Sequence, residues 1–130
     1  AAKAGVDVRI ITPHIPDKKL VFEATRASYM PLMKAGVKIY EYTPGFVHAK
    51  MFVSDDKLAT VGTANLDYRS LFLHFECGAL MYRSAAVSSV KADFLETFEK
   101  CHRCSIAEMK RCSPFGKALA FVMKIIAPLL

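Results

Sequence analysis

The stretch that decides the fold is Val47-His48-Ala49-Lys50-Met51-Phe52-Val53-Ser54, in which every second residue from Val47 onward is apolar. This period of two predicts a strand with His48 and Lys50 on one side, together with Phe52. Next-but-one residues of a strand lie roughly 6.5 to 7 Å apart. The long Lys50 side chain can therefore lean back, so that its ammonium and the His48 imidazole bracket one anionic group.

A turn and a returning strand are expected next. Asp55-Asp56-Lys57 predicts the turn and residues 58–61 the strand, so that Gly62-Thr63-Ala64-Asn65 emerges near His48 and Lys50. Gly62 permits an unusual backbone and a close approach of a ligand, and Asn65 offers amide donors to a phosphate oxygen. An imidazole, an ammonium and an amide around one phosphate predict phosphodiester chemistry, which needs no metal and no cofactor.

The rest of the chain alternates strands and helices. Strands are predicted at 6–11, 37–41 and 75–82, helices at 20–35 and 85–103, and a partly helical segment at 66–74. Gly5 is expected to cap a first helical turn and Gly36 to end the helix at 20–35, which should restart near Ser28 because Pro31 follows. The helix at 85–103 gathers an apolar face from Val87, Val90, Phe94, Leu95 and Phe98. This alternation predicts the α/β class, a mixed β-sheet with helices on its faces.

The spacing H-x-K, four residues, D, six residues, G-T-x-N resembles the signature of the phospholipase D superfamily. The run Asn65-Leu66-Asp67-Tyr68-Arg69-Ser70, the segment 44–50 and the pair Phe75-Glu76 resemble the carboxy-terminal half of bacterial cardiolipin synthases. The resemblance extends over residues 5–82 and resumes at 128–130. It departs at Thr63, where serine is usual, and at His74, where asparagine is expected. It implies one half of a bilobal phospholipase D-like fold at residues 1–104 and a helical tail at 105–130.

The resemblance also implies roles for single residues. His48 matches the histidine that either attacks phosphorus or protonates the leaving oxygen, while Lys50 and Asn65 match the pair that binds the phosphate. Glu76 matches an acid that hydrogen-bonds the histidine ring, and Asp55 is expected to be a positioning group.

Two further side chains are placed beside the phosphate. Thr63 keeps the hydroxyl of the usual serine. Arg69 either clasps a head-group phosphate or pairs with Asp67 or Glu76 as part of the scaffold.

The implied activity is that of a phosphatidyltransferase, which makes cardiolipin from two phosphatidylglycerols through a phosphohistidine. That mechanism needs two histidine motifs, and this chain carries one. The implied partners are therefore the amino-terminal half of the same enzyme or a second copy, with the full-length protein at the bacterial cytoplasmic membrane. The alternatives are a phosphodiesterase or nuclease of the same superfamily, and a catalytically incomplete half that serves as scaffold.

The amino-acid composition is compatible with each of these alternatives and does not choose between them. The chain has 130 residues, 53% of them hydrophobic, and a formal net charge of +6. The length suits one compact unit, and the charge favours anionic partners, whether a lipid surface or nucleic acid. The resemblance favours the lipid over nucleic acid.

Two patterns near the carboxy terminus leave alternatives open. Residues 115–130 are apolar apart from Lys117 and Lys124 and are short for a membrane span, so they form an interfacial helix or cover the core. The C-x-x-C spacing near residue 101 suggests a metal site only weakly, because there is no second pair of ligands at such spacing. Reduced thiols are expected instead. The residues concerned are Cys101, Cys104, Cys112 and His102.

Overall fold

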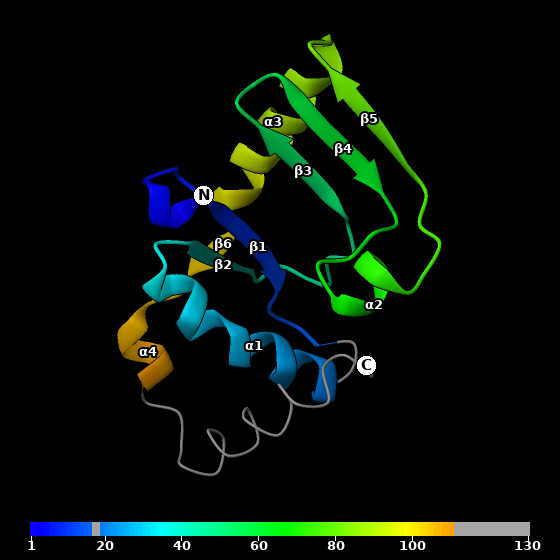
Figure 1. Cartoon of the computed structure of the whole chain (residues 1–130). Coiled ribbons are helices and arrows are strands. Elements are labelled where there is room, and N and C mark those ends of the chain that lie inside the picture. Colours follow the sequence, from blue (N-terminus) through cyan, green and yellow to red (C-terminus); the bar gives the residue numbers. More distant parts are fainter. Residues whose placement is uncertain (17–18, 111–130) are drawn as a thin grey trace. The chain divides into compact units, whose positions relative to one another are not determined.

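The computed structural model describes residues 1–16 and 19–110, and its contacts divide the chain into two compact units (Figure 1). The first unit comprises Ala1–Val47 and the chain from Lys100 onward, and the second comprises His48–Glu99. Each contains a three-stranded sheet and helices. The predicted α/β class is confirmed.

The first unit is built on a β-α-β element. Strand β1 (Arg9–Pro13) leads through helix α1 (Lys19–Lys34) to strand β2 (Lys38–Tyr42), which runs parallel to β1. Strand β6 (Cys101–Arg103) pairs antiparallel with the other edge of β2, which gives the order β1-β2-β6. The short 3-10 helix η1 (Ala2–Ala4) and helix α4 (Ile106–Lys110) complete this unit.

The core of the first unit lies between the sheet and its helices. Tyr29 of α1 and Ile39 of β2 are each 1% exposed, and Met109 of α4 packs with them. Burial alternates along β2, where Ile39 and Glu41 are the buried residues. Glu41 thus occupies a position that the strand period reserves for an apolar side chain.

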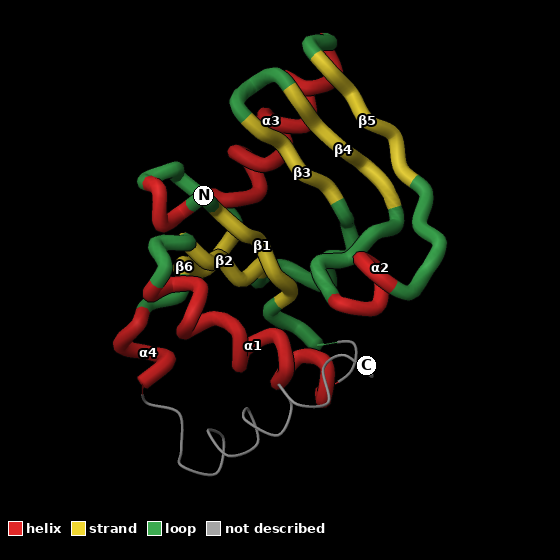
Figure 2. The backbone as a smooth tube through the Cα atoms, in the orientation of Figure 1, coloured by secondary structure: helices red, strands yellow, loops and turns green. Residues whose placement is uncertain are grey.

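The second unit is an antiparallel sheet of order β3-β4-β5 with strands Met51–Ser54, Leu58–Gly62 and Gly78–Tyr82. Helix α3 (Ala85–Glu99) contacts all three strands, and its Val87 is buried, as is Ala59 of β4. Helix α2 (Tyr68–Phe72) lies between the two loops that join β4 to β5 (Figure 2).

Glycine ends both of the helices predicted to stop at one. Gly5 has φ 88° and caps η1, and Gly36 has φ 100° directly after α1. The restart predicted near Ser28 is wrong, because α1 runs without a break through Pro31. Proline removes a single backbone donor here, and the adjacent turn is held in the core by Tyr29.

The helix predicted at 85–103 ends at Glu99, and Cys101–Arg103 is a strand. Pairing with β2, in which Cys101 lies opposite Tyr42, overrides the helical pattern of these residues. Cys101 and Cys104 therefore do not share a helix face.

The cysteines that the structure describes are free thiols. Burial raises the pKa of Cys104 to about 11. Cys77 falls within the strand predicted at 75–82, but it is exposed in the loop before β5, which begins at Gly78. Across residues 1–16 and 19–110, no three His, Cys, Asp or Glu side chains gather as metal ligands would.

The tail at 115–130, Cys112 and the interfacial helix lie outside the described residues. The domain boundary at residue 104 stays a prediction. Within the part of the chain that the structure describes, no helix is both long and apolar enough to cross a membrane.

Close backbone approach between β4 and β5 yields a first test. A Cβ at Gly62 would lie 2.6 Å from the carbonyl oxygen of Cys77 and 2.7 Å from Cα of Gly78. Gly62→Ala should therefore destabilise the chain by about 1 to 3 kcal/mol, as overpacking does. Gly45→Ala is the control, because a Cβ there meets nothing within 4 Å. Urea unfolding followed by circular dichroism compares them, and equal midpoints would contradict the tight packing at Gly62.

Candidate functional site

The predicted hairpin forms with a shorter first strand than expected. Strand β3 begins at Met51 rather than at Val47, but the pairing continues one residue further, since the Gly62 amide donates to the Lys50 carbonyl at 3.1 Å. Lys50 leans back toward His48, and its Nζ donates to the backbone carbonyl oxygen of His48 at 2.8 Å. The predicted bracketing of one anion by this ammonium and the imidazole stays a prediction. The His48 side chain is exposed.

Lys50 lines a hollow of about 290 Å³ on the second unit. The register places Phe52, Thr60 and Leu80 side by side, so alternate residues of the three strands face the same way as Lys50. Phe52 was already predicted on the side of His48 and Lys50. The full lining is Lys50, Phe52, Thr60, Val61, Gly62, Ala64, Glu76, Cys77 and Gly78.

Gly62 contributes to this site because its backbone lies close to the backbone of Cys77 and Gly78. Its φ lies outside the positive region, so the unusual backbone predicted there is absent, whereas its contact with the segment at Cys77 and Gly78 is tight. A side chain at this position would collide with the backbone of that segment.

The Thr63 hydroxyl ties the end of β4 to the loop before β5. It donates to Oε2 of Glu76 and accepts from the Cys77 amide at 3.0 Å, while the Thr63 amide donates to the Cys77 carbonyl at 2.9 Å. The threonine that replaces the family's serine thus keeps a hydrogen-bonding role. It joins Glu76 to the strand end that carries Gly62.

The Glu76 carboxylate is stabilised in its charged form although it is exposed. The hydrogen bond from Thr63, followed by one from Ser70, lowers its pKa below the ordinary value, against a smaller opposing effect of desolvation. The predicted partnership of Glu76 with the His48 ring stays a prediction.

The loop after Thr63 carries the remaining predicted residues. Asn65 is exposed in this loop, and the Asp67 carboxylate caps α2 by accepting from the Ser70 amide at 2.7 Å. Arg69 donates from Nε to Nε2 of His74 at 2.9 Å. His74 therefore replaces the expected asparagine with a ring nitrogen that accepts from Arg69.

Asp55 lies apart from this group. Asp55 and Asp56 have φ values of 51° and 56°, and the Lys57 amide donates to the Ser54 carbonyl at 3.1 Å, which makes a tight hairpin turn. Asp55 follows the last residue of β3 and Lys50 precedes the first, so strand geometry separates them by roughly 16 Å. The structure does not bring Asp55 to Lys50.

Sequence reasoning missed two features. Cys77 lines the hollow and bonds Thr63 through its backbone, which no pattern indicated. Glu41 is buried at 3% exposure and contacts His14 and Arg26 in the first unit. The sequence could have indicated this burial, because Glu41 lies two positions after Ile39 and therefore on the same side of the strand.

Comparison with known proteins places this site in a family. Residues 1–98 match a family model described as "Cardiolipin synthase, PLD-like domain", so these residues form a phospholipase D-like domain. The chain belongs to this cardiolipin synthase family of PLD-like domains.

Individual relatives cover the whole chain. A protein of Streptococcus mutans, named "Uncharacterized protein", is 50% identical over 130 residues, which are 28% of its own length. The "Cardiolipin synthase" of Geobacillus kaustophilus is 43% identical over 131 residues, and that of Halalkalibacterium halodurans 38% over 130, in each case 26% of the relative's length. The chain thus spans about a quarter of the length of these relatives.

A second test concerns the Thr63–Glu76 contact. Thr63→Val should raise the pKa of Glu76, because it removes the hydrogen bond that lowers this pKa most, whereas Thr63→Ser should leave it low. Carbon-detected NMR titration of the Glu76 carboxyl measures both variants. Since the folded pKa is lowered, the contact stabilises the fold above the unfolded-state pKa, and this contribution is lost as pH falls through the folded value. A Glu76 titration identical in wild type and Thr63→Val would refute the contact.

Proposed function

We propose that the chain carries one of the two catalytic motifs of a phosphatidyltransferase that forms cardiolipin from two phosphatidylglycerols. The observation that carries the proposal is the convergence of Lys50, Gly62, Glu76 and Cys77 on one hollow. His48 is exposed and is linked to this group by its backbone carbonyl, which accepts from the Lys50 ammonium. Membership of the cardiolipin synthase PLD-like family supports the choice of reaction.

The proposed reaction proceeds in two displacements. In the first, an imidazole nitrogen attacks the phosphorus of one phosphatidylglycerol, the bond to the glycerol oxygen breaks, and a second histidine protonates that oxygen. In the second, this histidine removes the proton from a hydroxyl of another phosphatidylglycerol, which attacks phosphorus and breaks the P–N bond. The products are cardiolipin and glycerol, and His48 takes one of the two histidine roles.

The neighbouring residues are proposed to bind and position. Lys50 and Asn65 hold the phosphate oxygens, and Arg69 is a further donor to them. Lys50 is suited to this role because its ammonium already lies beside the His48 backbone. Thr63 acts through Glu76, to which its one hydroxyl proton is donated.

The two acids act through their neighbours in this proposal. Glu76, kept charged by Thr63 and Ser70, favours the imidazolium form of His48. Asp55 acts through the hairpin turn that it helps to form, since it lies at the far end of β3.

The second motif is proposed to come from the amino-terminal half of the same enzyme, or from a second copy when the chain is isolated. The sheet face that carries Lys50 is apolar and accessible, with Phe52 41%, Leu80 67% and Tyr82 61% exposed. An accessible apolar face of this kind favours association. The chain spans only about a quarter of the length of its relatives, and this supports a second motif supplied from outside this segment.

The proposed setting is the bacterial cytoplasmic membrane, where the substrate is an anionic phospholipid. The net charge of +6 favours attraction to such a surface. The proposal assigns no metal or cofactor to the reaction.

The third test removes the proposed catalytic groups. His48→Ala and Lys50→Ala in the complete enzyme should each lower cardiolipin formation from phosphatidylglycerol in mixed micelles by about a thousandfold or more, as loss of a nucleophile or acid does. His102→Ala and Lys57→Ala are the controls, because they remove the same groups elsewhere, and should retain activity. Wild-type turnover by His48→Ala would contradict the assignment of His48 as a catalytic residue.

The fourth test concerns the missing motif. The chain alone should associate in light scattering and form no cardiolipin as a monomer, and adding the amino-terminal half should restore activity. A monomer that turns over substrate through His48 would contradict the two-motif mechanism. Salt-sensitive cleavage of nucleic acid in place of lipid transfer would instead favour the nuclease alternative.

A further inference from the structure

The buried Glu41 carboxylate is the least expected feature of the first unit. It lies on the side of β2 that also carries the buried Ile39, and it is 3% exposed. A buried carboxylate is costly unless it is paired, and a buried ion pair is a weaker source of stability than apolar packing. Its presence here therefore calls for a role other than packing.

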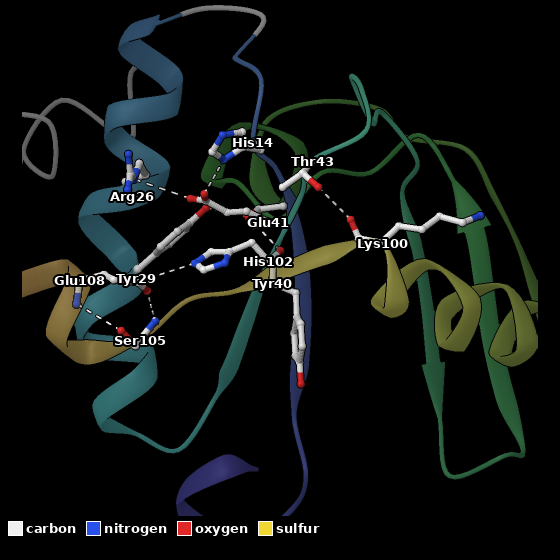
Figure 3. A network of polar contacts seen from close by, with 11 residues as sticks. His14, Arg26, Tyr29, Tyr40, Glu41, Thr43, Lys100, His102, Ser105 and Glu108 are labelled. Atoms are coloured by element: carbon white, nitrogen blue, oxygen red, sulfur yellow. Dashed lines mark hydrogen bonds and ion pairs between the residues drawn. The ribbon is translucent and has the colours of Figure 1, made fainter.

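Two nitrogen-bearing side chains meet this carboxylate from different elements (Figure 3). Nδ1 of His14 lies 2.8 Å from Oε2, and Nε of Arg26 lies 3.7 Å from Oε1. The backbone amide of His14 donates to the Tyr42 carbonyl at 3.2 Å, and the Arg26 guanidinium lies over the ring of Phe22 at 5.5 Å. Both side chains are thus held in place at one carboxylate.

Each of these side chains also reaches the surface. The His14 side chain is 52% exposed and that of Arg26 is 37% exposed, while the carboxylate between them is 4% exposed. With Nδ1 turned to Glu41, the Nε2 side of the imidazole is directed away from the carboxylate. A guanidinium has five donors, so Arg26 can face Glu41 with one edge and an oxyanion with another.

One hydrogen bond is missing from this arrangement. Oε1 of Glu41 is buried and has no hydrogen-bond partner among the described residues, because the 3.7 Å to Arg26 is too long. The nearby Tyr29 hydroxyl shares a hydrogen bond with Thr12 at 2.6 Å, in which either oxygen is the donor. Burial raises the pKa of Tyr29 most, and the neighbouring Glu41 carboxylate raises it further.

The position in the fold suits a ligand. His14 directly follows β1, and Glu41 lies near the end of the parallel strand β2. Ligands of α/β folds bind at the carboxyl ends of parallel strands, where the loops leave the sheet.

We propose that His14 and Arg26 form a binding site for the oxyanion of a phosphate ester, with Glu41 as the residue that positions them. The inference rests on the proposed function for the ligand class, the phosphoglycerol head group. Binding is measured without turnover, so it can fail while the assignment of His48 stands, and the reverse also holds.

The experiment is an NMR titration of the 130-residue chain, read at the His14 ring and the Arg26 Nε–H. The soluble probes are sn-glycerol 3-phosphate and inorganic phosphate. Bicelles with phosphatidylglycerol are compared with bicelles of phosphatidylcholine alone. Saturable shifts with either soluble probe identify the phosphate group itself as sufficient. Saturable shifts with phosphatidylglycerol bicelles alone identify the lipid head group, and both results support the site.

Variants separate this site from general attraction of anions. Arg26→Gln should weaken binding about tenfold or more, as loss of a charge-assisted hydrogen bond does. His14→Gln, read at Arg26, should do the same and provides a second variant should the first not fold. Arg103→Gln is the matched control, because it removes one exposed positive charge from β6 of the same unit, and it should bind as wild type. His48→Ala should also leave these shifts unchanged.

The proposal is overturned by the absence of a saturable shift with every probe. It is equally overturned if Arg26→Gln and His14→Gln titrate as wild type, or if Arg103→Gln loses as much affinity as they do.

Discussion

The geometry of the second unit depends on the hydroxyl of Thr63. It accepts from the backbone of Cys77 and donates to Glu76, just beyond the pair Gly62–Gly78 that ends the β4–β5 ladder. Because the Gly62 amide also bonds the Lys50 carbonyl, the position of Lys50 follows from the same junction. The Thr63 hydroxyl joins the end of β4 to the loop before β5 and lowers the pKa of Glu76, while the Gly62 amide joins the same end of β4 to Lys50.

The two carboxylates at the centre of these proposals are stabilised in different ways. Glu76 is exposed, and neutral hydroxyls lower its pKa. Glu41 is buried, and its counter-groups are His14 and Arg26 at the surface. In both proposals the acid positions its neighbours, because a fixed negative charge orients the donors around it.

Local patterns were reliable where a residue's own backbone decides the outcome. The turn at Asp55–Asp56 and the helix ends at Gly5 and Gly36 depend on residues that tolerate positive φ, and all were predicted. Patterns failed where a distant segment decides. Residues 101–103 follow a helix and continue its pattern, yet they pair with β2 as a strand. Pro31 and Ser28 suggested a break that the burial of Tyr29 prevents.

The sequence by itself determined the hairpin, its turn, the side of the strand that carries Lys50, and membership of a phospholipase D-like family, because these follow from strand period, turn residues and a spaced motif. Only the tertiary structure decided that Thr63 pairs with Glu76 and that Arg69 donates to His74. Such contacts depend on the register of β4 against β5 and on the loops around α2. No local pattern encodes the distance between side chains that the chain brings together only on folding.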